Sequence, residues 1–195
     1  MFKLSRLAIP MVDEGYYTRD SDEWLIYEFR ETYYALLRHF IWLFAPYIDG
    51  RVRQVQFGAK IGKDTVLGNS LVFTPERVEI GRNCYTGYGA IISAHVFEGN
   101  SLYLKKVKIG DNVTVGGYAI IMPGAEIGDN AVIGANSVVP KNRKIQAGTI
   151  WVSGRATPLR RGDVESTSEV TFHGMADPVQ IRNVEDHVDA LNEDD

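Results

Sequence analysis

Residues 109–139 read IGDNVTVGGYAIIMPGAEIGDNAVIGANSVV, and their aliphatic residues are regularly spaced. From Ile109 to Ile145 an aliphatic residue stands at every sixth position without a miss, seven in a row. If roughly a quarter of residues are aliphatic, such a run arises by chance about once in ten thousand. Four of these residues are followed directly by glycine. The chain therefore contains an internal repeat.

The six-residue period predicts the shape of each repeat. Six residues are too few for a strand and a helix, and they do not match the helical period of about 3.6. They suit a short strand followed by a tight turn, where asparagine and glycine tolerate a positive φ. Three such sides close a coil of about 18 residues, and coils stack about 4.8 Å apart. The repeat therefore predicts a parallel β-helix of about five coils. Asparagine recurs three residues after the aliphatic position at Asn83, Asn112, Asn130, Asn136 and Asn142.

The repeat divides the chain into three predicted regions of a mainly β protein. Residues 1–50 form an N-terminal helical segment, residues 51–155 form the β-helix, and residues 156–195 form an acidic C-terminal extension. The charge of the extension is typical of a solvated tail.

A helix is predicted over residues 20–45. Asp20 and Glu23 resemble a capping box at its start, and Pro46 ends it. Its apolar second half is shorter than the roughly 20 residues that a membrane span needs. Two interpretations remain open. The helix either caps the β-helix or covers a subunit face, or it contacts a membrane surface or a protein partner.

Composition limits the classes of function. The net charge of −4 argues against nucleic acid as a main partner. The single cysteine, Cys84, can neither form a disulfide within the chain nor share a metal site with a second thiolate. This suits a reducing cytoplasm. The first residues lack the continuous apolar core of a signal peptide. We therefore expect a cytoplasmic protein.

The stretch from 109 to 139 resembles the hexapeptide-repeat acyltransferases, which include galactoside, maltose and xenobiotic acetyltransferases. The resemblance covers residues 55–161. It implies a left-handed parallel β-helix and a homotrimer with active sites between neighbouring subunits. It also implies acyl transfer, acetyl in the first place, from coenzyme A to a hydroxyl or amine of a small-molecule acceptor. The segment SAHVFEG at 93–99 looks closest to terminal modules of some nonribosomal-peptide-synthetase-like enzymes.

The repeat breaks directly after His95 and resumes at Ile109. His95 occupies the corner position that asparagine fills elsewhere, so its imidazole is expected to project outward. In the family that the chain resembles, a histidine beside such an interrupting loop is the general base, a role that imidazole suits at neutral pH. The alternative is an ordinary surface histidine. Glu98 is a candidate to orient His95, or else a solvated loop charge.

The resemblance implies where the acyl donor binds. The pantetheine arm would lie against small residues of the later coils, Gly117 and Ala135. Lys141 would lie beside the coenzyme A phosphates and Arg161 would match the terminal arginine, although Pro140 departs from the family pattern. Further basic residues that suit phosphates, or else form a solvated rim, are Arg143, Lys144, Arg155 and Arg160.

The acceptor site and two other classes of function stay open. Asn69 and Tyr103 are candidate acceptor contacts. No metal is expected, because a carbonic anhydrase on this fold needs three converging histidines. Outside His95 the chain has His39, His173 and His187, none of them on the repeat. The remaining alternatives are a non-catalytic trimeric scaffold and acyl transfer from a carrier-protein thioester.

Overall fold

The computed structural model describes residues 10–44, 54–152 and 157–160. The chain divides into two compact units, residues 1–158 and 159–195. In the second unit only Leu159 and Arg160 are described, so the fold described below is that of the first unit. Most of the predicted acidic extension therefore lies outside the described residues.

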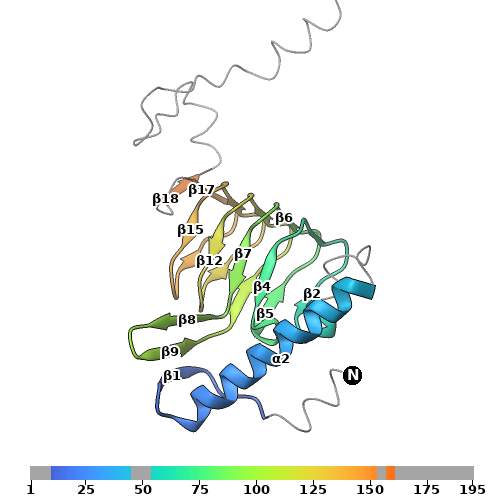
Figure 1. Cartoon of the computed structure of the whole chain (residues 1–195). Helices are drawn as coiled ribbons and strands as arrows, with labels where there is room; N and C mark the ends of the chain where they lie inside the picture. Colours follow the sequence, from blue (N-terminus) through green and yellow to red (C-terminus); the bar gives the residue numbers. More distant parts are fainter. Residues whose placement is uncertain (1–9, 45–53, 153–156, 161–195) are drawn as a thin grey trace, which may run out of the picture. The chain divides into compact units, whose positions relative to one another are not determined.

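Short parallel strands stack into three sheets around one core, which confirms the β-helix (Figure 1). We name the sheets by their outer surfaces as the charged, mixed and apolar faces. The charged face contains β2 (Lys60–Ile61), β5 (Val78–Ile80), β10 (Val107–Ile109), β13 (Glu126–Ile127) and β16 (Lys144–Ile145). The mixed face contains β3 (Val66–Leu67), β6 (Tyr85–Thr86), β11 (Thr114–Val115), β14 (Val132–Ile133) and β17 (Thr149–Val152). The apolar face contains β4 (Leu71–Phe73), β7 (Ile91–Ser93), β12 (Ile120–Ile121) and β15 (Val138–Val139). A 3-10 helix (Pro75–Arg77) follows β4, and β18 spans Thr157–Arg160.

The repeated aliphatic residues point into the core. Ile121 and Ile133 are fully buried, and the small residues between them, Ala125 and Ala131, are buried as well. Small side chains at these positions leave room for the large ones of the three faces, so the core is close-packed. The six-residue period thus places one inward residue on each face of each coil. This residue is a large aliphatic one except at Thr86 and Trp151 on the mixed face.

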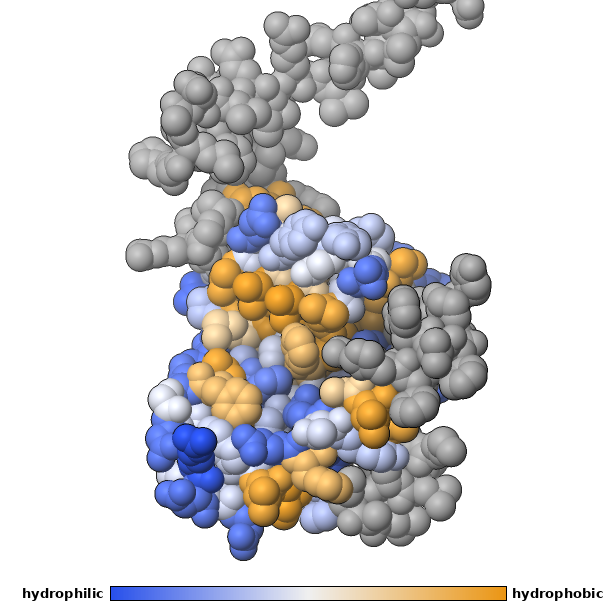
Figure 2. Space-filling model, viewed as in Figure 1, coloured by the Kyte–Doolittle hydropathy of each residue, from blue (hydrophilic) through white to orange (hydrophobic). Residues whose placement is uncertain are grey.

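The outer sides of the faces differ in polarity. Outward residues of the charged face alternate in sign along the stack, and Lys60 pairs with Glu79 at 2.7 Å and Lys144 with Glu126 at 3.0 Å. The outward residues of the apolar face form an uncharged ladder, seen as an apolar band in Figure 2. Its members, in register from coil to coil, are Leu71, Ile91, Ile120 and Val138.

The turns between faces have the predicted backbone conformation. Each asparagine of the repeat has a positive φ between 54° and 59°. We call the turns between the mixed and apolar faces the glycine edge, because they contain Gly68, Gly87, Gly116 and Gly134. We call the turns between the apolar and charged faces the hairpin edge.

His95 does not adopt the predicted corner conformation. It is the first residue of β8 (His95–Glu98), which forms a hairpin with β9 (Ser101–Leu104) at the hairpin edge. Stacked residues are 18 positions apart in regular coils, as Asp111 and Asp129 are, but 29 apart across this coil, as Asn83 and Asn112 are. The chain therefore inserts an antiparallel hairpin directly at His95, and β1 (Gly15–Thr18) pairs with its second strand.

The N-terminal helix is confirmed as α2 (Asp22–Phe44), which lies along the hairpin edge (Figure 1). Its cap is Ser21 and not the predicted Asp20, because Ser21 Oγ accepts a hydrogen bond from the Trp24 N–H at 3.3 Å. Trp24 packs on Phe97 of the hairpin, with ring centroids 5.0 Å apart. Among the described residues, no helix is long and apolar enough to cross a membrane.

A buried ion pair ties α2 to the first coil. Arg30 Nε lies 3.1 Å from Glu76 Oε1, and both side chains are nearly inaccessible to solvent. Arg30 also donates to the Tyr34 hydroxyl at 2.9 Å and to the Pro10 carbonyl at 3.2 Å. Arg30 lies on the buried face of α2, and its contacts hold the helix on the hairpin edge.

Candidate functional site

His95 is half-buried among aromatic rings from α2, the first coil and the hairpin. Its ring is 5.4 Å from Tyr27, 5.9 Å from Phe73 and 5.6 Å from Phe97, measured between centroids. Burial lowers the pKa of His95 to about 4, because the imidazolium would lose its hydration there. The imidazole is therefore neutral at pH 7.

Two hydroxyl groups face Nδ1 of His95. Thr74 Oγ1 lies at 3.0 Å and Ser93 Oγ at 3.4 Å. Thr74 donates its proton to Glu31 Oε1 at 3.1 Å, and Ser93 donates its proton to the His95 carbonyl at 2.8 Å. Since each hydroxyl has one proton, both oxygens accept on the side of Nδ1. With the imidazole proton on Nδ1, Nδ1 donates to these oxygens and Nε2 carries the lone pair. No hydrogen bond from the described residues reaches Nε2.

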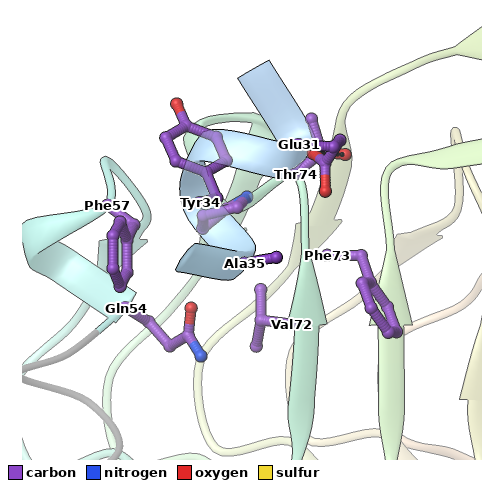
Figure 3. A pocket seen from close by; sticks show the side chains of 9 residues that line it. Glu31, Tyr34, Ala35, Gln54, Phe57, Val72, Phe73 and Thr74 are labelled. Carbon is purple, nitrogen blue, oxygen red and sulfur yellow. Dashed lines mark hydrogen bonds between the residues drawn. The ribbon is translucent and has the colours of Figure 1, made fainter. Parts of the chain in front are cut away.

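Thr74 and Glu31 are absent from the sequence-based candidates. Thr74 lies at the corner after β4, where the six-residue register slips, and it has φ 53° and ψ 56°. Glu31 is on α2. Together they form one end of a cavity of about 80 Å³ between α2 and β4 (Figure 3). The buried residues on either side of Thr74, Val72 and Ile80, are eight positions apart instead of six, and this irregularity is the only sequence signal for either residue.

Glu98 does not contact His95 as proposed. Its carboxylate instead accepts a hydrogen bond from Lys141 Nζ at 2.6 Å. Along the strand β8, His95 and Glu98 are three residues apart and so point to opposite sides. The pair raises the pKa of Lys141, because the ammonium donates to the carboxylate. Glu98 and Lys141, for which the sequence predicts separate roles, therefore pair with each other. A coenzyme A phosphate would have to compete with Glu98 for Lys141.

Tyr103 is also not placed to contact an acceptor in this chain. It is buried in β9, and its hydroxyl donates to Asn142 Oδ1 at 2.7 Å. Lys105 Nζ binds the same oxygen at 2.8 Å. These contacts fasten the hairpin to the corner of a later coil, so the role of Tyr103 in the structure is to hold the hairpin.

Asn69, Gly117 and Ala135 lie together on the glycine edge. The chain turns at each of them, and Asn69 has φ 54°. A Cβ at Gly117 would lie 3.2 Å from the Tyr88 carbonyl oxygen, a tight contact that glycine avoids. The register of β4 against β7 puts Asn69 and His95 at opposite ends of the apolar face. Within one chain, the candidate base His95 therefore lies at the hairpin edge, and Asn69, Gly117 and Ala135 lie at the glycine edge.

The basic residues near the end of the β-helix have partners where they are described. The Arg143 guanidinium lies 5.0 Å from the ring centroid of Trp151, and Lys144 pairs with Glu126. The side chains of Arg155, Arg160 and Arg161 lie outside the described residues.

In the part of the chain that the structure describes, no three His, Cys, Asp or Glu side chains gather closely enough to hold a metal ion. His39, whose side chain is not described, and His173 and His187 fall outside that comparison. The hairpin edge offers a neutral imidazole whose Nε2 has no hydrogen-bond partner among the described residues.

Comparison with known proteins agrees with the repeat. Residues 106–141 match the family model "Bacterial transferase hexapeptide (six repeats)". The chain is 32% identical over 86 residues to "Putative acetyltransferase YvoF" of Bacillus subtilis, a match that covers 44% of this chain and 46% of that protein. The chain spans less than half the length of the curated relatives it matches, 13% of one and 46% of the other.

Solved structures share the fold. A maltose O-acetyltransferase from Clostridium difficile 630 superposes with a TM-score of 0.54 at 24% identity, covering 75% of this chain and 92% of that one. A galactoside acetyltransferase in complex with coenzyme A gives a TM-score of 0.52 at 19% identity, covering 91% and 98%. These similarities confirm the left-handed parallel β-helix. The chain is therefore a hexapeptide-repeat protein with the fold of the hexapeptide-repeat acetyltransferases.

Proposed function

We propose that the protein is an acyltransferase that moves an acyl group, most simply acetyl, from coenzyme A to a hydroxyl or amine of a small molecule. His95 is the general base. The observation that carries this proposal is the neutral imidazole of His95, with Nδ1 directed at hydroxyl oxygens and Nε2 without a partner among the described residues. The shared fold with acetyltransferases, one of them in complex with coenzyme A, supports the choice of reaction.

The reaction follows from the state of the imidazole. Nε2 takes the proton of the acceptor hydroxyl or amine while the acceptor oxygen or nitrogen attacks the thioester carbonyl. The tetrahedral intermediate then expels the coenzyme A thiolate, and the imidazolium returns the proton to the sulfur. One C–S bond breaks and one C–O or C–N bond forms, so the enzyme ends in its starting state.

Coenzyme A fits the glycine edge better than the hairpin edge. Gly117 and Ala135 present little side-chain bulk, so an extended arm can approach the backbone there. No hydrogen bond from the Gly117 N–H to another described residue is present, which leaves a donor for the thioester carbonyl. At the hairpin edge Lys141 is already paired with Glu98.

We propose a homotrimer because one chain does not bring the two edges together. The base lies on the hairpin edge and the small residues lie on the glycine edge, with the apolar face between them. The exposed ladder of that face, in which Leu71 is 41% and Ile120 36% exposed, is a surface that association would bury. In a ring, the hairpin edge of one copy meets the glycine edge of the next.

Mixed trimers test the shared site. His95→Asn removes the base from the hairpin edge, and Ala135→Trp obstructs the glycine edge. Each variant alone should be inactive, whereas every mixed trimer has one interface with both edges intact and should recover about one third of wild-type turnover. Purification through two different affinity tags isolates the mixed species for assay. No recovery in mixed trimers of correct mass would mean that each site lies within a single chain.

Titration with acetyl-coenzyme A tests the donor. We expect saturable binding with one site per chain in calorimetry, and a loss of affinity of about tenfold or more in Ala135→Trp, since a bulky ring would fill the path of the arm. Val66→Trp, on the exposed side of the mixed face, is the matched control. Absence of binding by the folded protein would contradict coenzyme A as donor, and a carrier-protein thioester would then be assayed. If the protein binds neither coenzyme A thioesters nor carrier-protein thioesters, the remaining hypothesis is a non-catalytic scaffold.

A further inference from the structure

The Nδ1 side of His95 is held by a chain of polar groups that ends at a carboxylate on α2. The chain runs from His95 Nδ1 to Thr74 Oγ1 at 3.0 Å and from Thr74 to Glu31 Oε1 at 3.1 Å. We propose that Thr74 and Glu31 are positioning residues that fix His95 in its Nδ1–H tautomer and so keep Nε2 as the proton acceptor. This inference rests on the proposed function, in which Nε2 is the base.

The direction of the hydrogen bonds sets the tautomer. The Thr74 hydroxyl donates to Glu31 Oε1, and it has no second proton to offer His95. The Thr74 lone pairs then face His95 Nδ1 and the Tyr27 hydroxyl, which lies at 3.3 Å. Burial, and next the charge of Glu31, raise the pKa of Tyr27, so its hydroxyl keeps its proton and can donate. With the hydrogen bonds in these directions, Nδ1 of His95 faces a hydroxyl acceptor, and a proton on Nδ1 completes the chain.

The backbone at Thr74 gives a second reason to assign it a role. Its φ of 53° and ψ of 56° lie in the left-handed region, which is unfavourable for a β-branched residue. Six other corners of the coils use asparagine in this conformation. Such strain persists where the surroundings or a function require the residue. A buried hydroxyl in contact with both Glu31 and His95 supplies that requirement.

The same contacts make the N-terminal segment part of the site. Glu31 and Tyr27 come from α2, whereas Thr74 and His95 come from two adjacent coils. Glu31 and Thr74 are 43 residues apart in the sequence. The orientation of His95 therefore depends on α2 being seated on the hairpin edge.

Nitrogen NMR of histidine-labelled protein without substrate reads the tautomer directly, with His95→Asn assigning the signal. We expect the wild type to show the Nδ1–H form. In Glu31→Gln and Thr74→Val, the Nε2–H form should become detectable, because Thr74 is either free to donate to Nδ1 or lacks its hydroxyl. Turnover of both variants should fall by about 10- to 100-fold. Thr74→Ser retains the hydroxyl and should keep the wild-type tautomer and turnover.

Thr65→Val and Glu28→Gln are the matched controls. Thr65 is a buried threonine whose hydroxyl donates to the Gly81 carbonyl at 2.7 Å, and Glu28 is an exposed glutamate on α2, three residues before Glu31. Neither should change the tautomer of His95. An Nε2–H wild type, or an unchanged tautomer in both Glu31→Gln and Thr74→Val, would overturn the proposal. If Thr74→Val does not fold, the tautomers of Glu31→Gln and Thr74→Ser test the proposal: Glu31→Gln should show the Nε2–H form and Thr74→Ser should not. Since the spectrum needs no acceptor, it tests the positioning role even if acyl transfer is not found.

Discussion

His95→Asn should lower turnover by about 10²- to 10⁴-fold, the contribution that a general base commonly makes. Asparagine can place its amide N–H where Nδ1–H lies, so the contact with Thr74 Oγ1, 3.0 Å long in the wild type, can persist. The proton-accepting Nε2 is lost. Steady-state assay of acyl transfer measures the effect, and acetyl-coenzyme A affinity should remain within a few-fold, since the donor is proposed to lie on the glycine edge.

The pH dependence of the wild type provides the internal check on this role. A protonated imidazole cannot accept a proton, so kcat/KM falls as pH drops through the pKa of the free enzyme. Burial holds the pKa of His95 at about 4, compared with about 6.5 in an exposed histidine. The acid limb attributed to His95 is therefore expected near pH 4 and should disappear in His95→Asn. Wild-type turnover in that variant would exclude His95 as the base.

The fold could be predicted from sequence because its determinants are local. Each coil repeats the same short pattern, and an asparagine at a corner adopts a positive φ for reasons contained in its own side chain. Strand stacking then follows from the period alone. The N-terminal helix was predicted for similar reasons, although a local hydrogen bond made Ser21 the cap instead of Asp20.

The surroundings of His95 could not be predicted, because they join distant segments. The break in the repeat identified His95, but nothing near it in sequence indicates Thr74, 21 residues away, or Glu31 on α2. Glu98 is a candidate to orient His95 only because it is close to it in sequence. The inserted residues form a strand, in which positions three apart face opposite sides, so Glu98 meets Lys141. Local proximity was misleading where the secondary structure changed.

Arg30→Met should destabilise the protein by about 3–5 kcal/mol, the usual effect of removing one partner from a buried ion pair. Methionine keeps much of the side-chain volume but leaves Glu76 buried without its cation. Glu76 Oε2 is already the one buried side-chain oxygen among the described residues without a hydrogen-bond partner. Burial raises the pKa of Glu76 despite the opposing effect of Arg30. Urea unfolding followed by tryptophan fluorescence measures the change, and turnover should fall too as α2 loosens over His95.

Two variants separate this effect from general loss of charge. Arg82→Met removes an arginine that pairs with Asp111 at 2.8 Å but is 72% exposed, so it should change the stability far less than Arg30→Met does. Arg30→Met combined with Glu76→Gln removes the uncompensated carboxylate and should recover part of the stability. A carboxyl group with a raised folded-state pKa destabilises the fold as pH rises above its unfolded value. Arg30→Met should accordingly be closer to wild-type stability near pH 4.5 than at pH 7, and equal losses at both pH values would contradict the assignment of the cost to Glu76.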